Sequence, residues 1–145
     1  MKISEEGLDL IRTHEGLELV AYPDPGTGGA PWTVGFGHTG SNVFEGLHIT
    51  EEHADELLRR DVATAERCVN NSVKVSLTQG QFDACCSLVF NIGCGNFRSS
   101  TLLRLLNAGD DIGAAGEFAK WTHANGKVLR GLVVRRKAEM DRFIA

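Results

Sequence analysis

The chain has 145 residues, of which 42% are hydrophobic and 23% charged, a composition typical of one globular domain rather than of a disordered or fibrous protein. No apolar run approaches the ~20 residues that a membrane-spanning helix needs, and the N-terminus lacks the apolar stretch of a signal peptide. The net charge of -4 divides unevenly: residues 1–61 carry four basic and twelve acidic side chains, whereas residues 62–145 carry eleven and seven.

The first predicted element is an amphipathic helix from Ser4 to His14, with Ser4 as its N-cap. Gly16 predicts that this helix stops there, which places Glu15 at its carboxyl end. From residue 19 to residue 47 the pattern changes to short glycine-rich strands and turns. Within that region Asp24 lies between two prolines, so we expect it on a stiff loop.

Five more helices are predicted downstream. Thr50 can cap a long helix that continues to about Cys68, and Thr78 with Gln81 has the spacing of a capping box for the next one. Apolar residues at helical spacing mark three others, over residues 102–109, 112–119 and 132–144.

These elements predict an α+β fold. A small antiparallel β lobe would occupy about residues 17–49 and a connecting helix about 50–70. A larger helical lobe would take up about 72–145 together with the N-terminal helix. We expect an active-site cleft between the lobes, with Glu15 at one edge and with Asp24 and Thr33 on the β side.

Glu15 and Asp24 are two carboxylates in unlike settings. The negative end of a helix dipole disfavours an ionised group, so Glu15 is the better general acid and Asp24 the better carboxylate. Such a pair is the minimum needed to hydrolyse a glycosidic bond. Taken alone, however, each is more simply interpreted as an ordinary surface carboxylate, one at a helix end and one in a turn.

Other patterns point away from metal, nucleotide or redox chemistry. The four cysteines, Cys68, Cys85, Cys86 and Cys94, lack zinc-site spacing. Cys85 and Cys86 lie in an apolar run and are predicted to be buried thiols, and the lack of a signal peptide argues against disulfides. The G-x-G-x-x-G sequence at 35–40 does not open a helix, so it is not a nucleotide fingerprint. The histidines at 38, 48 and 53 lack a metal-binding motif. The basic run 135–137 has no interleaved aromatic platform for nucleic acid.

Several blocks, in order along nearly the whole chain, resemble the phage-type lysozymes, muramidases of tailed bacteriophages. The N-terminal blocks are His14-Glu15-Gly16, Ala21-Tyr22-Pro23-Asp24 and Thr33-Val34-Gly35-Phe36-Gly37-His38-Thr39. The later ones are Gln81-Phe82-Asp83-Ala84, Phe90-Asn91-Ile92-Gly93 and Gly131-Leu132-Val133-Val134-Arg135-Arg136-Lys137-Ala138-Glu139.

The resemblance implies a lysozyme-like fold and hydrolysis of the β-1,4 bond between N-acetylmuramic acid and N-acetylglucosamine in peptidoglycan. It assigns Glu15 as general acid, with Asp24 and Thr33 positioning the attacking water. It assigns substrate binding to three further residues, Thr39, Phe90 and Asn91.

The same resemblance makes His38 and Asp61 a structural pair. It brings an arginine of the last helix to Glu15, and Arg135 aligns better there than Arg136. It implies no metal, no cofactor, no nucleic-acid partner, no stable membrane insertion and a monomer. With no signal peptide, the enzyme would be made in the host cytoplasm and reach the cell wall at lysis.

Two alternatives remain open from the residues. One is a non-catalytic wall-binding module on the same fold, and the other is a membrane disruptor acting through its basic last helix. The sequence also departs from the family's shortest pattern at the glycine-rich segment 25–32, where Trp32 could stack on a sugar or fill the β lobe. A second departure, Asn125, replaces a glycine of the family's turn.

Overall fold

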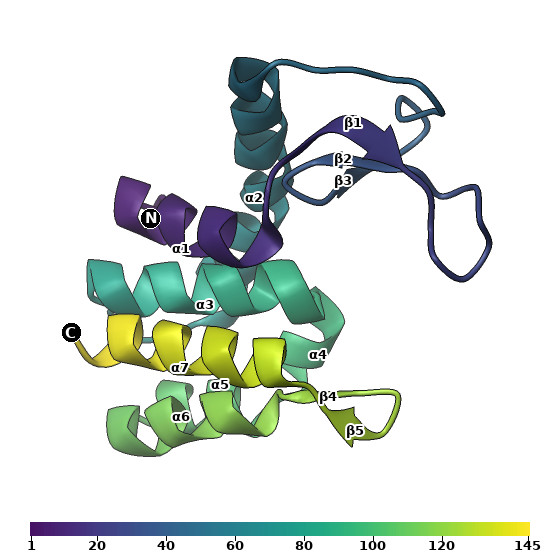
Figure 1. The fold of residues 1–145 in the computed structure, drawn as a ribbon. Helices are drawn as coiled ribbons and strands as arrows, with labels where there is room; N and C mark the ends of the chain where they lie inside the picture. The colour runs from purple at the N-terminus through teal and green to yellow at the C-terminus, as the bar shows by residue number, and fades with distance from the viewer. The chain divides into compact units, whose positions relative to one another are not determined.

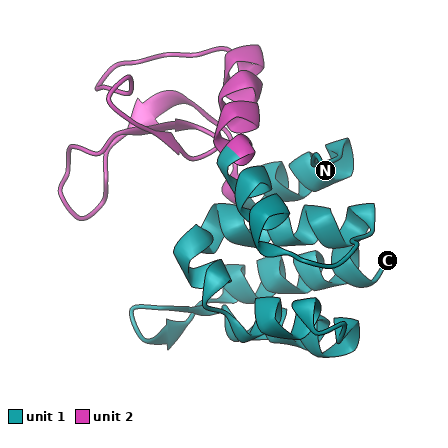
Figure 2. Ribbon diagram, turned by 180° about the vertical axis from the view of Figure 1, so that it is seen from behind, with its two compact units in different colours: residues 1–14, 64–145 teal, residues 15–63 magenta.

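In the computed structural model, which describes residues 1–145, the chain divides into two units (Figure 2). One unit comprises residues 1–14 and 64–145, and the other comprises residues 15–63. We call them the helical unit and the β unit. Each has its own hydrophobic core.

The elements are labelled in Figure 1. The helices are α1 (Glu5–Glu15), α2 (Glu51–Ser72), α3 (Gln79–Ile92), α4 (Cys94–Arg98), α5 (Thr101–Asn107), α6 (Asp111–Glu117), the 3₁₀ helix η1 (Phe118–Lys120) and α7 (Arg130–Ile144). The strands are β1 (Glu18–Tyr22), β2 (Thr33–Gly35), β3 (His38–Thr39), β4 (His123–Ala124) and β5 (Lys127–Val128).

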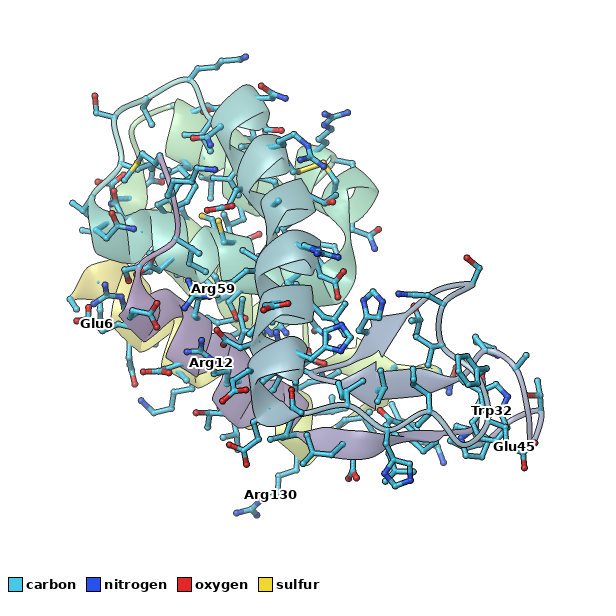
Figure 3. All side chains as sticks on the ribbon, turned by 90° about the horizontal axis from the view of Figure 1, so that it is seen from above. Glu6, Arg12, Trp32, Glu45, Arg59 and Arg130 are labelled. Carbon is cyan, nitrogen blue, oxygen red and sulfur yellow. A yellow bond between two sulfur atoms is a disulfide. The ribbon has the colours of Figure 1, made fainter.

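The β unit is built on an antiparallel sheet in the order β1-β2-β3. Its core is small and consists of Ala21, Val34, Val43 and Leu57. Leu57 comes from the part of α2 that belongs to this unit. Trp32 lies at the loop end of the sheet, where it is partly buried and packs against this core (Figure 3). Filling the β unit is therefore one role that Trp32 has.

The helical unit is built around α3, which lies alongside α7 (Figures 1 and 2). The ten residues from Gly80 to Val89 are all buried, as expected for a helix that is apolar nearly all round. The capping box predicted for α3 is confirmed: the Thr78 side chain accepts from the Gln81 N–H, and the Gln81 side chain accepts from the Thr78 N–H.

A buried carboxylate anchors the N-terminus of the helical unit. Asp83 on α3 is fully buried, accepts from the Ser4 N–H at 3.0 Å and bonds the Ser4 hydroxyl. The guanidinium of Arg142 on α7 donates to the same carboxylate at 2.8 Å. Ser4 Oγ also accepts from the Gly7 N–H, which confirms Ser4 as the N-cap of α1.

The structure corrects the expectation that the chain has no disulfide. Cys68 at the end of α2 and Cys94 at the start of α4 form a disulfide, with their Cα atoms 5.9 Å apart. Cys85 and Cys86 are free and buried, as predicted. Burial, reinforced by the charge of Glu139, raises the pKa of the Cys85 thiol to about 12.

The predicted fold class is confirmed: a small antiparallel sheet accompanies a larger set of helices. The long helix runs further than predicted, to Ser72, and its start is capped by the Thr50 side chain, which accepts from the His53 N–H at 3.1 Å. Two short elements were not predicted, α4 and the β4–β5 hairpin. None of the helices combines the length and hydropathy required to span a membrane.

Candidate active site

Glu15 is the last residue of α1, as the sequence predicts. Gly16 ends the helix with φ +74°, a conformation that favours glycine. The Glu15 side chain is half-buried and lies against the turn between β2 and β3. A Cβ atom on Gly37 would lie only 2.8 Å from Glu15 Oε1, so the carboxylate occupies space that a side chain at position 37 would need.

Asp24 is fixed by the loop that follows β1. One carboxylate oxygen accepts from the Gly26 N–H at 2.7 Å, and the Asp24 carbonyl accepts from the Gly28 N–H at 2.8 Å. The Asp24 N–H donates to the Gly29 carbonyl at 2.9 Å, which closes the loop on itself. The glycines of this segment thus bring backbone donors to Asp24, and the second carboxylate oxygen remains available to a ligand or water.

Thr33 is the first residue of β2. The register pairs Thr33 with Tyr22, two residues before Asp24. On its other side Thr33 pairs with Thr39, the residue that the family resemblance assigns to substrate binding. Directly paired residues of an antiparallel sheet share a face, so Tyr22, Thr33 and Thr39 form one row across the sheet.

His38 and Asp61 lie together, as the family resemblance implies. His38 Nδ1 is 2.8 Å from Asp61 Oδ2, and His38 Nε2 is 3.2 Å from Asn42 Oδ1. The pair ties β3 to α2 within the β unit, and both side chains are partly buried.

The remaining predicted site residues lie in the helical unit. Phe90 is half-buried and Asn91 exposed, both in the last turn of α3. Arg135 on α7 is buried, with its Nε 3.3 Å from Glu139 Oε2 and its Nη2 donating to the Ser87 carbonyl. The contact of Arg135 with Glu15 stays a prediction.

A buried charge network on α7 was missed at the sequence level. Glu139 is fully buried, accepts from the Ser87 hydroxyl and pairs with Arg135 and with Arg136, whose Nε lies 3.1 Å from Glu139 Oε1. Burial raises the pKa of Glu139, against the opposing effect of the Arg136 charge. The spacing of these residues could have predicted the network, because Arg136 and Arg135 precede Glu139 by three and four residues and side chains at those spacings on a helix can pair.

The arrangement of potential metal ligands is a further feature of the site. No group of three or more His, Cys, Asp or Glu side chains is arranged to hold a metal ion.

The family model described as phage lysozyme matches residues 12–139. The endolysin of Acyrthosiphon pisum secondary endosymbiont phage 1 is 50% identical over 99% of this chain and 98% of its own length. The endolysin of Bacillus phage PZA is 46% identical over 99% of this chain, which spans only 55% of that relative.

The chain is also similar to muramidases of known structure. The muramidase domain of SpmX from Asticaccaulis excentricus superposes with a TM-score of 0.91 and 41% sequence identity, covering 99% of this chain and 98% of that domain.

Proposed function

Because the chain belongs to the phage lysozyme family, we propose that it is an endolysin that hydrolyses the β-1,4 bond between N-acetylmuramic acid and N-acetylglucosamine and so lyses the host cell. Membership of the family makes the chain an enzyme of the muramidase type whose substrate is peptidoglycan. The choice of bond, the residue roles and host lysis are the parts that we propose.

One observation supports the proposed roles most directly. Glu15 lies against Gly37, in the turn between β2 and β3, within the same folded unit as Asp24 and Thr33. The end of a helix and a three-stranded sheet thus bring a half-buried carboxyl group and a loop carboxylate into one unit of 49 residues. The two carboxylates of a glycosidase need such unlike settings to take opposite protonation states.

In the proposed reaction, Glu15 gives its proton to the glycosidic oxygen as the bond to the anomeric carbon breaks. Asp24 accepts a proton from water, and the resulting oxygen nucleophile bonds to the anomeric carbon. The oxygen of Asp24 that Gly26 does not bind is free to hold this water. The Thr33 hydroxyl would provide a second contact to the water, and Thr39 is its neighbour on the sheet.

His38 and Asp61 are proposed to act on structure rather than on chemistry. Their contact connects β3, which follows the Gly37 turn, to α2. This link would hold the turn in place against Glu15.

The test is an analysis of the ends released from purified peptidoglycan. The proposal requires free N-acetylmuramic acid at the new reducing ends. N-acetylglucosamine ends would indicate a glucosaminidase, and anhydro ends would indicate a lytic transglycosylase, so either result would overturn the proposed bond cleavage.

The variant Glu15→Gln keeps the shape of the side chain and removes its proton-donating carboxyl group. We expect its rate to fall by about 10²–10⁴-fold, the usual size of general acid catalysis. A pure wall-binding module would release no ends with either form, and a membrane disruptor would be insensitive to the substitution.

A further inference from the structure

The turn of the β4–β5 hairpin consists of Asn125 and Gly126, which join Ala124 of β4 to Lys127 of β5. Both turn residues have positive φ, +52° for Asn125 and +77° for Gly126. Two consecutive positive φ values are typical of a type I′ turn, for which Asn-Gly is a preferred sequence. Asn125 is also the position at which this chain replaces a glycine of the family's turn.

An asparagine that precedes a glycine can modify itself. The carboxamide carbon of the asparagine, Cγ, is an electrophile, and the backbone nitrogen of the next residue becomes a nucleophile when it loses its proton. A side chain on the next residue hinders the attack, and glycine has none. The reaction also needs a carboxamide that is free to turn and a backbone that can rotate.

Six of the seven asparagines in the chain lack that freedom. Asn71 lies in α2, whose helical backbone restrains rotation, and its carbonyl accepts from Lys74 Nζ at 2.8 Å. The side chains of the other five are held by hydrogen bonds: Asn42 to His38, Asn70 to Met1, Asn91 to Arg136, Asn96 to the Ile92 carbonyl, and Asn107 to the backbone of Lys74 and Ser72.

Asn125 has neither kind of restraint. It is exposed, and its carboxamide makes none of these contacts. The register pairs Ala124 with Lys127, so the Gly126 N–H lies in the turn, outside the strand pairing. The strands β4 and β5 have two residues each, and so short a hairpin is held by few backbone bonds. The turn can therefore rotate while the rest of the helical unit stays folded.

From this combination we propose that Asn125 is a site of spontaneous deamidation. The Gly126 nitrogen attacks Asn125 Cγ, a bond forms between the two atoms, and the bond from Cγ to Nδ2 breaks. Nδ2 leaves as ammonia and takes up the proton that the Gly126 nitrogen gives up. The product is a cyclic imide, a succinimide, and water is the one co-reactant needed to open it.

Water opens the imide at either of its two carbonyls. Attack at Cγ gives aspartate, and attack at the main-chain carbonyl of residue 125 gives isoaspartate, in which the side-chain methylene becomes part of the backbone. Either product adds one negative charge, which changes the net charge of the chain from -4 to -5. Because isoaspartate lengthens the turn, we expect it also to disrupt the pairing of Ala124 with Lys127.

The test is a peptide map of the folded protein during incubation at mildly alkaline pH. Trypsin releases residues 121–127 as one peptide, in which Asn125 is the only asparagine. Mass spectrometry detects the replacement of NH₂ by OH, and labelling by an isoaspartyl methyltransferase detects the isoaspartate. We expect product at Asn125 before any of the other six asparagines reacts. In urea, where the structure no longer restrains them, we expect the other six to react faster than in the folded protein.

Two variants make the same test on the intact protein by ion exchange. Asn125→Gly removes the reacting carboxamide and puts a residue that tolerates positive φ in the turn, so its charge should stay constant during incubation. The matched control Asn71→Gln removes another exposed asparagine and should gain the acidic form as fast as the native protein.

Two results would overturn the inference. One is an Asn125 that stays unmodified in the folded protein while it reacts in urea, because the turn would then be too rigid for the attack. The other is an acidic form that appears as fast in Asn125→Gly as in the native protein, because the reacting asparagine would then lie elsewhere.

Discussion

At the scale of single residues, the candidate site depends on the glycines around the carboxylates as much as on the carboxylates themselves. Gly37 has φ +78°, and a Cβ there would approach Glu15 Oε1 to 2.8 Å. Gly26 supplies the N–H that holds Asp24. The settings of the two acids make them candidates, and only the family resemblance assigns them catalytic roles. The contact of Gly37 with Glu15 could not be predicted, because it joins segments that become neighbours only in the folded unit.

We predict that Gly37→Ala loses activity out of proportion to its loss of stability. The positive φ costs an alanine about 1–2 kcal/mol, and the new methyl group also displaces the Glu15 carboxylate. A misplaced catalytic group can reduce the rate by about 10²-fold. Wall-clearing rates and urea unfolding measure the two effects.

The control for this substitution is Gly46→Ala. Gly46 has φ +86°, but no atom lies within 4 Å of the position that an alanine methyl group would take, so the change carries the same backbone cost without touching Glu15. It should lose similar stability and keep its activity. If the two alanine variants had equal activity at equal stability, the placement of Glu15 against the turn would not matter for catalysis.

At the scale of elements, local signals predicted where helices begin better than how they are connected. Ser4, Thr50 and Thr78 were predicted as caps, and each accepts a backbone N–H near the start of its helix. In each of these bonds the donor and the acceptor are three residues apart, so the bond can be predicted from the local sequence. The disulfide of Cys68 and Cys94 joins residues 26 apart, and only packing brings α2 and α4 together, so this pairing was missed.

Counting thiols tests both the disulfide and the buried cysteines. A disulfide-exchange reagent reacts with thiolates, and burial raises the pKa of Cys85 to about 12 and that of Cys86 still further. We therefore expect no labelling of the folded protein at pH 8 or pH 9. We expect two thiols after unfolding without reductant and four after unfolding with reductant, because the disulfide withholds two.

Four reactive thiols in the unfolded, unreduced protein would show that Cys68 and Cys94 are not bonded. Rapid labelling of the folded protein near pH 8 would show instead that Cys85 or Cys86 is accessible.

At the scale of the whole molecule, the proposed chemistry and the main stability reside in different units. The β unit carries Glu15, Asp24 and Thr33 but has seven buried hydrophobic residues, four of which form its core cluster. The helical unit has a core cluster of seventeen. Because burial of apolar surface is the main source of stability, and because small units are hard to stabilise, the β unit should be the weaker of the two.

We therefore predict that the β unit opens without the helical unit. Native-state hydrogen exchange at low urea should give the amides of β1, β2 and β3 a smaller opening free energy than those at the centre of α3. The amides of α2 provide an internal comparison, since this helix passes from one unit into the other at residue 64. Its exchange should follow the β unit before that residue and the helical unit after it. One common opening free energy for β2 and α3 would contradict the prediction, because it would mean that the four-residue core is lost only when the whole chain unfolds.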